Sequence, residues 1–105
     1  MIKLRRWQET MAEITVKLFG VFRSDTHMAK QTVNAVTLMD IFPILNDEVE
    51  KNIEKKRAED PSIEKPEPIK FKDAVVYVNG ERISKKGYKL KDGDEVWLMS
   101  PASGG

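Results

Sequence analysis

One stretch of the sequence carries the apolar spacing of a long amphipathic helix, and it limits the fold more than any other feature. Its apolar side chains recur at intervals of three and four residues: Leu38, Ile41, Phe42, Leu45, Val49 and Ile53. A chain of 105 residues forms one core, so this helix has to bury its apolar stripe against a sheet. The sequence therefore predicts a single α+β domain with one main helix.

Capping and breaking residues mark the ends of this helix. Thr37 and Asp40 have the spacing of a capping box. Pro43 leaves two alternatives, a kinked helix capped by Thr37 or a later helix capped by Asp40 with the proline in its first turn. Residues 46–72 contain 8 acidic and 7 basic side chains and three prolines, so the helix should give way near Asp60 to a charged connection. Such mixed charge is typical of a solvated surface, and the alternative is a partner-binding insertion.

Two strands are expected before the helix. Three aliphatic side chains, Ile14, Val16 and Leu18, alternate with Thr15, Lys17 and Phe19, which is the pattern of a strand with one buried face. Residues 30–36 are rich enough in β-branched side chains for a second, short strand. Ser24, Asp25 and Thr26 between them favour a turn, so the domain should open with a β-hairpin.

Two or three strands are expected after the helix. Residues 74–78 are almost continuously apolar, which suits a central strand buried on both faces, and Asn79 and Gly80 follow as a turn. Residues 81–83 return as a brief strand. Turns at 85–87 and 91–94 then lead to a last strand at 95–99, whose Trp97 we interpret as a packing or rim aromatic. The result is a mixed sheet of four to five strands.

Composition excludes most side-chain catalysis. The chain has no Cys, and its one histidine, His27, is expected to be solvated, so a thiolate nucleophile, a cysteine-ligated zinc site and a histidine metal cluster are all ruled out. We therefore predict no metal site. With 18 basic and 17 acidic side chains, the chain lacks the excess of positive charge that is typical of nucleic-acid-binding proteins, so we predict no nucleic-acid partner.

The N-terminal segment argues for a cytoplasmic protein without a membrane partner. No stretch is apolar enough for a membrane span, and residues 1–10 lack the apolar core of a secretory signal. Because Met11 is a second candidate start, we expect residues 1–10 to be an extension of a domain that covers residues 11–99. A functional basic arm is the alternative.

The sequence ends in a thin tail, residues 100–105, that should be flexible and project from the core. Pro101 cannot continue a strand, Ala102 and Ser103 are small, and Gly104 and Gly105 have no Cβ. A frayed terminus is one interpretation. The other is that the α-carboxylate of Gly105 is the reactive group, which would require another protein to activate it, most simply as an acyl-adenylate made from ATP.

The sequence resembles a known family at both ends. The motifs are ITVKLFGVFR at 14–23, VNGERI at 78–83, KLKDGDEVWLM at 89–99 and the terminal SPASGG. They are similar to those of the ubiquitin-like β-grasp sulfur carriers of the MoaD and ThiS types, and closest to the small subunit of molybdopterin synthase. The similarity covers roughly residues 13–45 and 74–105, whereas residues 1–10 and 46–72 depart from the pattern.

The resemblance implies a function and partners. An adenylating enzyme of the ubiquitin-activating type would use ATP to activate Gly105, and sulfur transfer would convert it to a thiocarboxylate. Pro101, Ala102, Ser103 and Gly104 would thread into the active site of the molybdopterin synthase large subunit, and no cofactor would be bound by the carrier itself. By position along the motifs, the docking face would include Phe19, Ile83 and Met99, although core membership is an equal alternative for the last two.

Three other functions stay open from the sequence. The chain could carry sulfur for thiamine or another pathway, it could be a ubiquitin-like modifier joined to lysines through Gly105, or it could be an interaction module with an inert tail.

Overall fold

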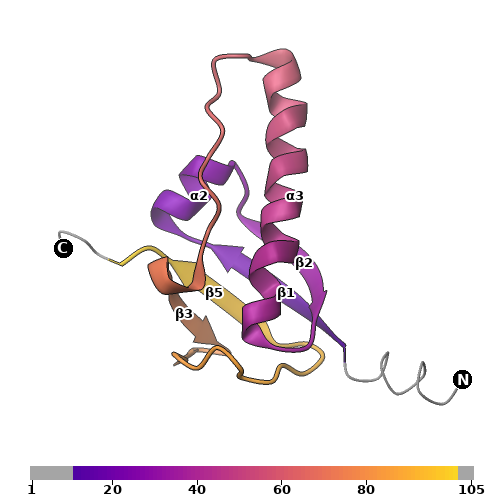
Figure 1. Ribbon diagram of the computed structural model, residues 1–105, viewed down its shortest axis with the longest axis vertical. Helices are drawn as coiled ribbons and strands as arrows, with labels where there is room; N and C mark the ends of the chain where they lie inside the picture. The colour runs from indigo at the N-terminus through magenta and orange to yellow at the C-terminus, as the bar shows by residue number, and fades with distance from the viewer. Residues whose placement is uncertain (1–10, 102–105) are drawn as a thin grey trace, which may run out of the picture.

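The computed structural model describes residues 11–101, which form a five-stranded sheet, two α-helices and a short 3-10 helix (Figure 1). The strands are β1 (Ala12–Leu18), β2 (Lys30–Ala35), β3 (Val75–Val78), β4 (Glu81–Arg82) and β5 (Glu95–Met99), and the helices are α2 (Gly20–Thr26), α3 (Leu38–Glu59) and the 3-10 helix η1 (Phe71–Asp73). The expected extension at 1–10 and the tail residues 102–105 lie outside the described residues.

The first and last strands lie side by side in the middle of the sheet. The strand order is β2-β1-β5-β3-β4. β1 and β5 run parallel, with Thr15 opposite Glu95 and Leu18 opposite Leu98, whereas every other pair is antiparallel. The predicted α+β fold, a mixed sheet with one main helix, is confirmed.

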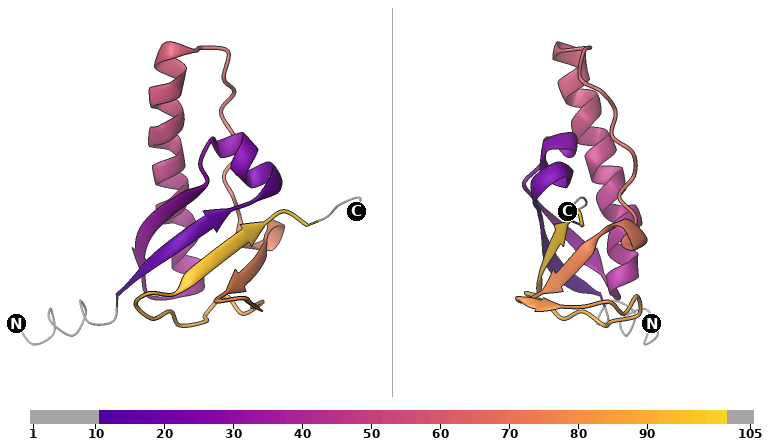
Figure 2. Two further views of the ribbon diagram at one scale, coloured as in Figure 1. Left: turned by 180° about the vertical axis from the view of Figure 1, so that it is seen from behind. Right: turned by 90° about the vertical axis from the view of Figure 1, so that its left-hand side faces the viewer.

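Helix α3 covers one face of this sheet (Figure 2). The alternation in β1 is strict, because Ile14, Val16 and Leu18 are buried under α3 while the residues between them are half-buried. The strand β3 follows the same rule: Val76 and Val78 point into the core, but Val75 and Tyr77 are only half-buried. The prediction that β3 is buried on both faces is therefore wrong, since no helix among residues 11–101 covers the second face.

The structure decides between the two alternatives for Pro43. Thr37 is the N-cap, and the carboxylate of Asp40 accepts hydrogen bonds from the Thr37 backbone N–H and hydroxyl at 3.0 and 2.9 Å. Pro43 thus lies inside the helix, where its missing N–H leaves one helical hydrogen bond unmade. The helix ends at Glu59 with Asp60 as C-cap, as the charged sequence predicts.

The predicted turn at residues 24–26 is wrong, because a seven-residue helix, α2, occupies this connection. Gly20 turns the chain out of β1 with a φ of 58°, and His27 ends the helix with a φ of 56°. Thr26 is buried, and its backbone carbonyl accepts a hydrogen bond from Asn52 of α3 at 3.1 Å. Contacts with α3 and β5 therefore hold a helix that is too short to show an apolar period of its own. The antiparallel pairing of β1 with β2 is as predicted.

The charged connection consists of two different structures. Residues 46–59 continue α3, and residues 61–70 return beside it as extended chain (Figure 1). Asn46 ties this return to the helix, because its side-chain amide donates to the Ile69 carbonyl at 2.9 Å and its oxygen accepts from the Ile69 N–H at 2.8 Å. None of the described helices is long and apolar enough to cross a membrane.

Candidate functional site

The turn before β5 is fixed by every residue of its Asp-Gly-Asp-Glu sequence. Asp92 accepts a hydrogen bond from the Glu13 N–H at 2.7 Å, and the Gly93 N–H donates to the Glu13 carbonyl at 3.0 Å. Gly93 has a φ of 88°, a conformation that favours glycine. These bonds join the start of β1 to the start of β5, so they set the register of the two central strands.

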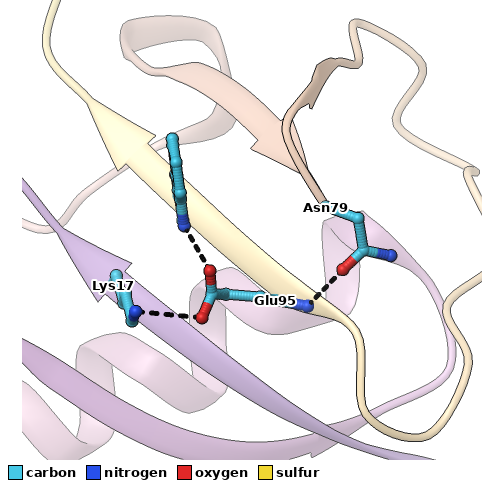
Figure 3. A network of polar contacts seen from close by, with 4 residues as sticks. Lys17, Asn79 and Glu95 are labelled. Atoms are coloured by element: carbon cyan, nitrogen blue, oxygen red, sulfur yellow. Dashed lines mark hydrogen bonds and ion pairs between the residues drawn. The ribbon is translucent and has the colours of Figure 1, made fainter.

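Asp94 forms the second part of this turn. It is buried, and its two carboxylate oxygens accept hydrogen bonds from the Asn79 side-chain amide and from the Lys91 N–H, both at 2.8 Å. The Asn79 side-chain oxygen in turn accepts from the Glu95 N–H at 2.9 Å (Figure 3). The acidic residues therefore serve turn geometry, as expected from the sequence. No group of three His, Cys, Asp or Glu side chains within residues 11–101 is arranged to hold a metal ion.

Glu95 is the first charged group on the face of the sheet opposite α3, which we call the open face. Its carboxylate accepts a hydrogen bond from the Trp97 indole at 2.8 Å and pairs with Lys17 at 3.0 Å (Figure 3). The hydrogen bonds from Lys17 and Trp97 lower the pKa of Glu95 from its ordinary value of 4.5. Because Glu95 is held on two sides, the indole beside it is oriented as well.

An apolar cluster lies next to Glu95 on the open face, and we call it the aromatic patch (Phe19, Tyr77, Trp97 and Met99). The Trp97 ring meets Phe19 edge-on with centroids 5.6 Å apart, and it lies 6.3 Å from the Tyr77 ring. Met99 follows Trp97 on the same side of β5, opposite Val75 of β3. All four side chains are half-buried, so part of each is accessible to a partner.

The patch lies where the tail begins. Phe19 contacts β5 a second time, because its backbone N–H donates to the Leu98 carbonyl at 3.1 Å. Met99 ends β5, Ser100 is half-buried, and Pro101 is exposed. The chain therefore leaves the sheet from its central strand, β5 (Figure 2). The aromatic patch lies at this point, because it includes Met99, the last residue of β5.

The structure brings together two of the three residues expected to form a docking face. Phe19 and Met99 both lie in the aromatic patch. Ile83 lies elsewhere: its N–H donates to the Val76 carbonyl at 2.9 Å, and its side chain packs against the core. Ala102, Ser103, Gly104 and Gly105 lie outside the described residues.

Sequence reasoning did not include Trp97 and Tyr77 in the docking face. The signal was present in the alternation of residues 95–99, because buried Val96 and Leu98 place Trp97 and Met99 together on the other face. Tyr77 could not be assigned from its own strand, where the apolar run hides the alternation.

Comparison with known proteins identifies the family. The model of the ThiS family matches residues 16–105. The solution structure of small archaeal modifier protein 1 (SAMP1) from Methanosarcina acetivorans is 26% identical, covers 90% of this chain and 98% of that chain, and has a TM-score of 0.63. No curated protein matches the sequence.

Two further solved structures share the fold. A putative molybdopterin converting factor subunit 1 from Pyrococcus furiosus is 23% identical over 87% of this chain and 99% of that one, with a TM-score of 0.53. A chain in the complex of subunits 1 and 2 of the molybdopterin-converting factor from Helicobacter pylori is 20% identical over 89% of this chain and 99% of its own, with a TM-score of 0.52. With a β-grasp fold and a family match that runs through Gly105, this chain belongs to the ThiS family of ubiquitin-like proteins, as a small sulfur carrier or SAMP-like modifier.

Proposed function

We propose that this chain carries sulfur on its C-terminal glycine, Gly105, and supplies it for molybdopterin as the small subunit of molybdopterin synthase. The observation that carries the proposal is the family match, which extends through the tail to residue 105. The two molybdopterin-converting factor structures support the choice of pathway by their shared fold. The exit of the chain beside the aromatic patch supports a tail that is held at its base and inserted at its tip.

The chemistry takes place at the carboxylate of Gly105 in two steps. A carboxylate oxygen attacks the α-phosphorus of ATP in the adenylating enzyme, which forms an acyl-adenylate and releases pyrophosphate. Hydrosulfide then attacks the acyl carbon, and AMP leaves with the bonding electron pair. One carboxylate oxygen is thereby replaced by sulfur, and glycine, which has no side chain, leaves the acyl carbon open to the attack of hydrosulfide.

The aromatic patch has a separate part in this proposal. A partner that receives the tail has to hold the carrier while the tip reacts, because small displacements at a reacting carbon cost large factors in rate. Phe19, Trp97 and Met99 offer an apolar anchor at the base of the tail, and Lys17 and Glu95 offer a polar rim beside it. Ile83 has no place in this surface, because its side chain packs against the core.

Mass spectrometry of the intact chain tests the proposal. The chain is incubated with ATP, sulfide and the adenylating enzyme encoded by the same genome, and the expected product is heavier by the difference between sulfur and oxygen. Deletion of Gly105, or addition of one alanine after it, should abolish the product while the circular dichroism spectrum stays the same. An unmodified mass for the intact chain would contradict the proposal. Sulfur transfer from the product to a pterin precursor with the large subunit tests the pathway.

A second candidate function is supported by the 26% identical SAMP1 structure, which is that of a small archaeal modifier protein. In this case an amine rather than hydrosulfide attacks the acyl-adenylate, and AMP leaves as an amide bond forms. Tryptic peptides from cell lysates that carry residues 92–105 of this chain on a lysine, joined through Gly105, would support the modifier function if they are present in the normal strain and absent from one lacking this chain.

A further inference from the structure

A groove on the α3 side of the molecule combines an apolar floor with a basic rim. Its volume is about 410 Å³, within the size range of ligand pockets. Met39, Phe42, Ile69 and Phe71 supply the apolar surface, and Lys70, Lys72 and Lys86 lie around it. We call this surface the lysine-rimmed groove. It is distinct from the aromatic patch, because α3 and the patch are on opposite faces of the sheet.

Met39 gives the groove its accessible apolar surface. Its side chain is 43% exposed, and among the described residues only Val21 is a comparably exposed large hydrophobic. Phe42 is buried at the floor and meets the Phe71 ring edge-on, with centroids 5.8 Å apart and planes at 82°. An apolar side chain of a partner could thus rest on Met39 and Phe71 without any change in the core.

The walls of the groove are held in place before anything binds. The paired hydrogen bonds of Asn46 with Ile69 join the 68–72 segment to α3. The Met39 N–H donates to the Lys86 carbonyl at 3.0 Å, and this bond fixes the segment around Lys86 to the first turn of α3. Because hydrogen bonds within the chain hold these walls, a ligand would not have to order them, and preorganisation of this kind favours affinity.

The charge of the groove is of one sign. Its lining includes three lysines and no Asp or Glu. Lys70, Lys72 and Lys86 are exposed, and none of them forms an ion pair with another residue in the 11–101 range. Such a site complements a negative ligand with an apolar centre, although the chain as a whole has a net charge of only +1.

We propose that the lysine-rimmed groove binds an acidic segment of a partner protein. One apolar side chain of that segment rests on Met39 and Phe71, and carboxylates on either side of it face Lys70, Lys72 and Lys86. A protein segment fits better than a nucleic acid, because the floor of the groove is apolar and the basic groups are confined to its rim. The groove and the aromatic patch can then be occupied at the same time.

The test is a titration of the full ¹⁵N-labelled chain with a synthetic peptide, acetyl-Asp-Glu-Leu-Phe-Asp-Glu-amide, followed by NMR. The expected result is a set of chemical-shift changes centred on the amides of Met39, Phe71 and Lys86, which weaken as salt is raised. A control peptide with Gly-Ser in place of Leu-Phe should bind about tenfold more weakly or worse.

Two variants with the same change of net charge locate the binding. Lys70→Glu/Lys72→Glu should raise the peptide Kd by about tenfold or more. Lys55→Glu/Lys56→Glu changes two exposed lysines that do not line the groove, and should leave the Kd within about twofold. If the first variant fails to give a folded spectrum, Lys86→Glu takes its place with a smaller expected loss.

Four outcomes would overturn the proposal. They are no shift at roughly 2 mM peptide, equal loss of binding in both double variants, tighter binding of a short oligouridylate at the same residues, and concentration-dependent shifts of the groove amides without peptide. The third would indicate a nucleic acid ligand, and the fourth a second copy of this chain. None of these results bears on the chemistry of Gly105, so the groove and the proposed function succeed or fail independently.

Discussion

The ring of Phe19 meets the indole of Trp97 edge-on, with centroids 5.6 Å apart and planes at 64°. Pairs of this geometry contribute about 0.5–1.5 kcal/mol beyond the burial of their area. The contact joins the residue that precedes α2 to the last strand, and it leaves both rings half-exposed on the open face. The same contact therefore stabilises the base of the tail and forms the surface that a partner would meet.

Phe19→Arg or Met99→Arg should weaken the binding of the partner that receives the tail, without unfolding the chain. Both side chains are half-buried on the open face, and apolar anchors at an interface can each contribute about 2 kcal/mol or more. The measurements are the partner Kd by calorimetry and the urea midpoint. Val21→Arg is the control, because Val21 is 54% exposed and is not part of the patch. Unfolding of both patch variants would assign these side chains to the core instead.

The pKa of Glu95 should be lower than 4.5 in the folded chain and should rise toward 4.5 in Lys17→Met. Hydrogen bonds from Lys17 and then Trp97 favour the charged carboxylate. The resulting stability is fully present above pH 4.5 and is lost as the pH falls through the lower folded pKa. Carbon-detected NMR titration measures the pKa directly, and equal values near 4.5 in both proteins would refute the ion pair.

Asn79→Asp should destabilise the chain by about 1–3 kcal/mol near neutral pH. The new carboxylate would lose the donor to Asp94 and would stand against the Asp94 carboxylate at the position of a 2.8 Å hydrogen bond. Repulsion between two carboxylates is relieved when one of them is protonated, so the loss should shrink as the pH is lowered toward 4. Asn79→Gly separates the two effects, because it keeps the backbone φ of 53° available, removes both hydrogen bonds and adds no charge. A loss independent of pH in Asn79→Asp would disprove the repulsion.

Pro43→Ala should stabilise the chain by about 2 kcal/mol, because proline in a helix interior costs about 3 kcal/mol relative to alanine and returns part of this through the unfolded state. Pro43 is exposed, so its replacement removes no core contact. Urea unfolding measures the gain. Pro61, which lies just beyond the end of α3, is the matched control, and Pro61→Ala should give no increase. If Pro43→Ala did not raise the stability, or if only Pro61→Ala did, Pro43 would not destabilise the helix.

The parts of the fold with an apolar period of their own could be predicted from the sequence. The spacing from Leu38 to Ile53 and the alternation through Leu18 and Leu98 lead directly to α3, β1 and β5. Helix α2 could not be predicted, because its seven residues are held by contacts such as that of Asn52 with Thr26, which only the tertiary structure supplies.

The candidate site was predictable to a similar extent. The family motifs pointed to Phe19 and Met99, and the structure finds both on the open face. The lysine-rimmed groove could not be assembled from the sequence, because Met39, Phe71 and Lys86 belong to three separate segments that meet only after folding.

The central pairing of β1 with β5 has a consequence for the chain as it leaves the ribosome. Thr15 cannot pair with Glu95 until Glu95 has been synthesised, and until then β2-β1 and β3-β4 are two separate strand pairs without the strand that joins them. The nascent polypeptide therefore lacks a complete aromatic patch, since Trp97 and Met99 belong to that last strand. A partner that requires the aromatic patch together with the tail would thus bind folded chains and not nascent ones that still lack β5.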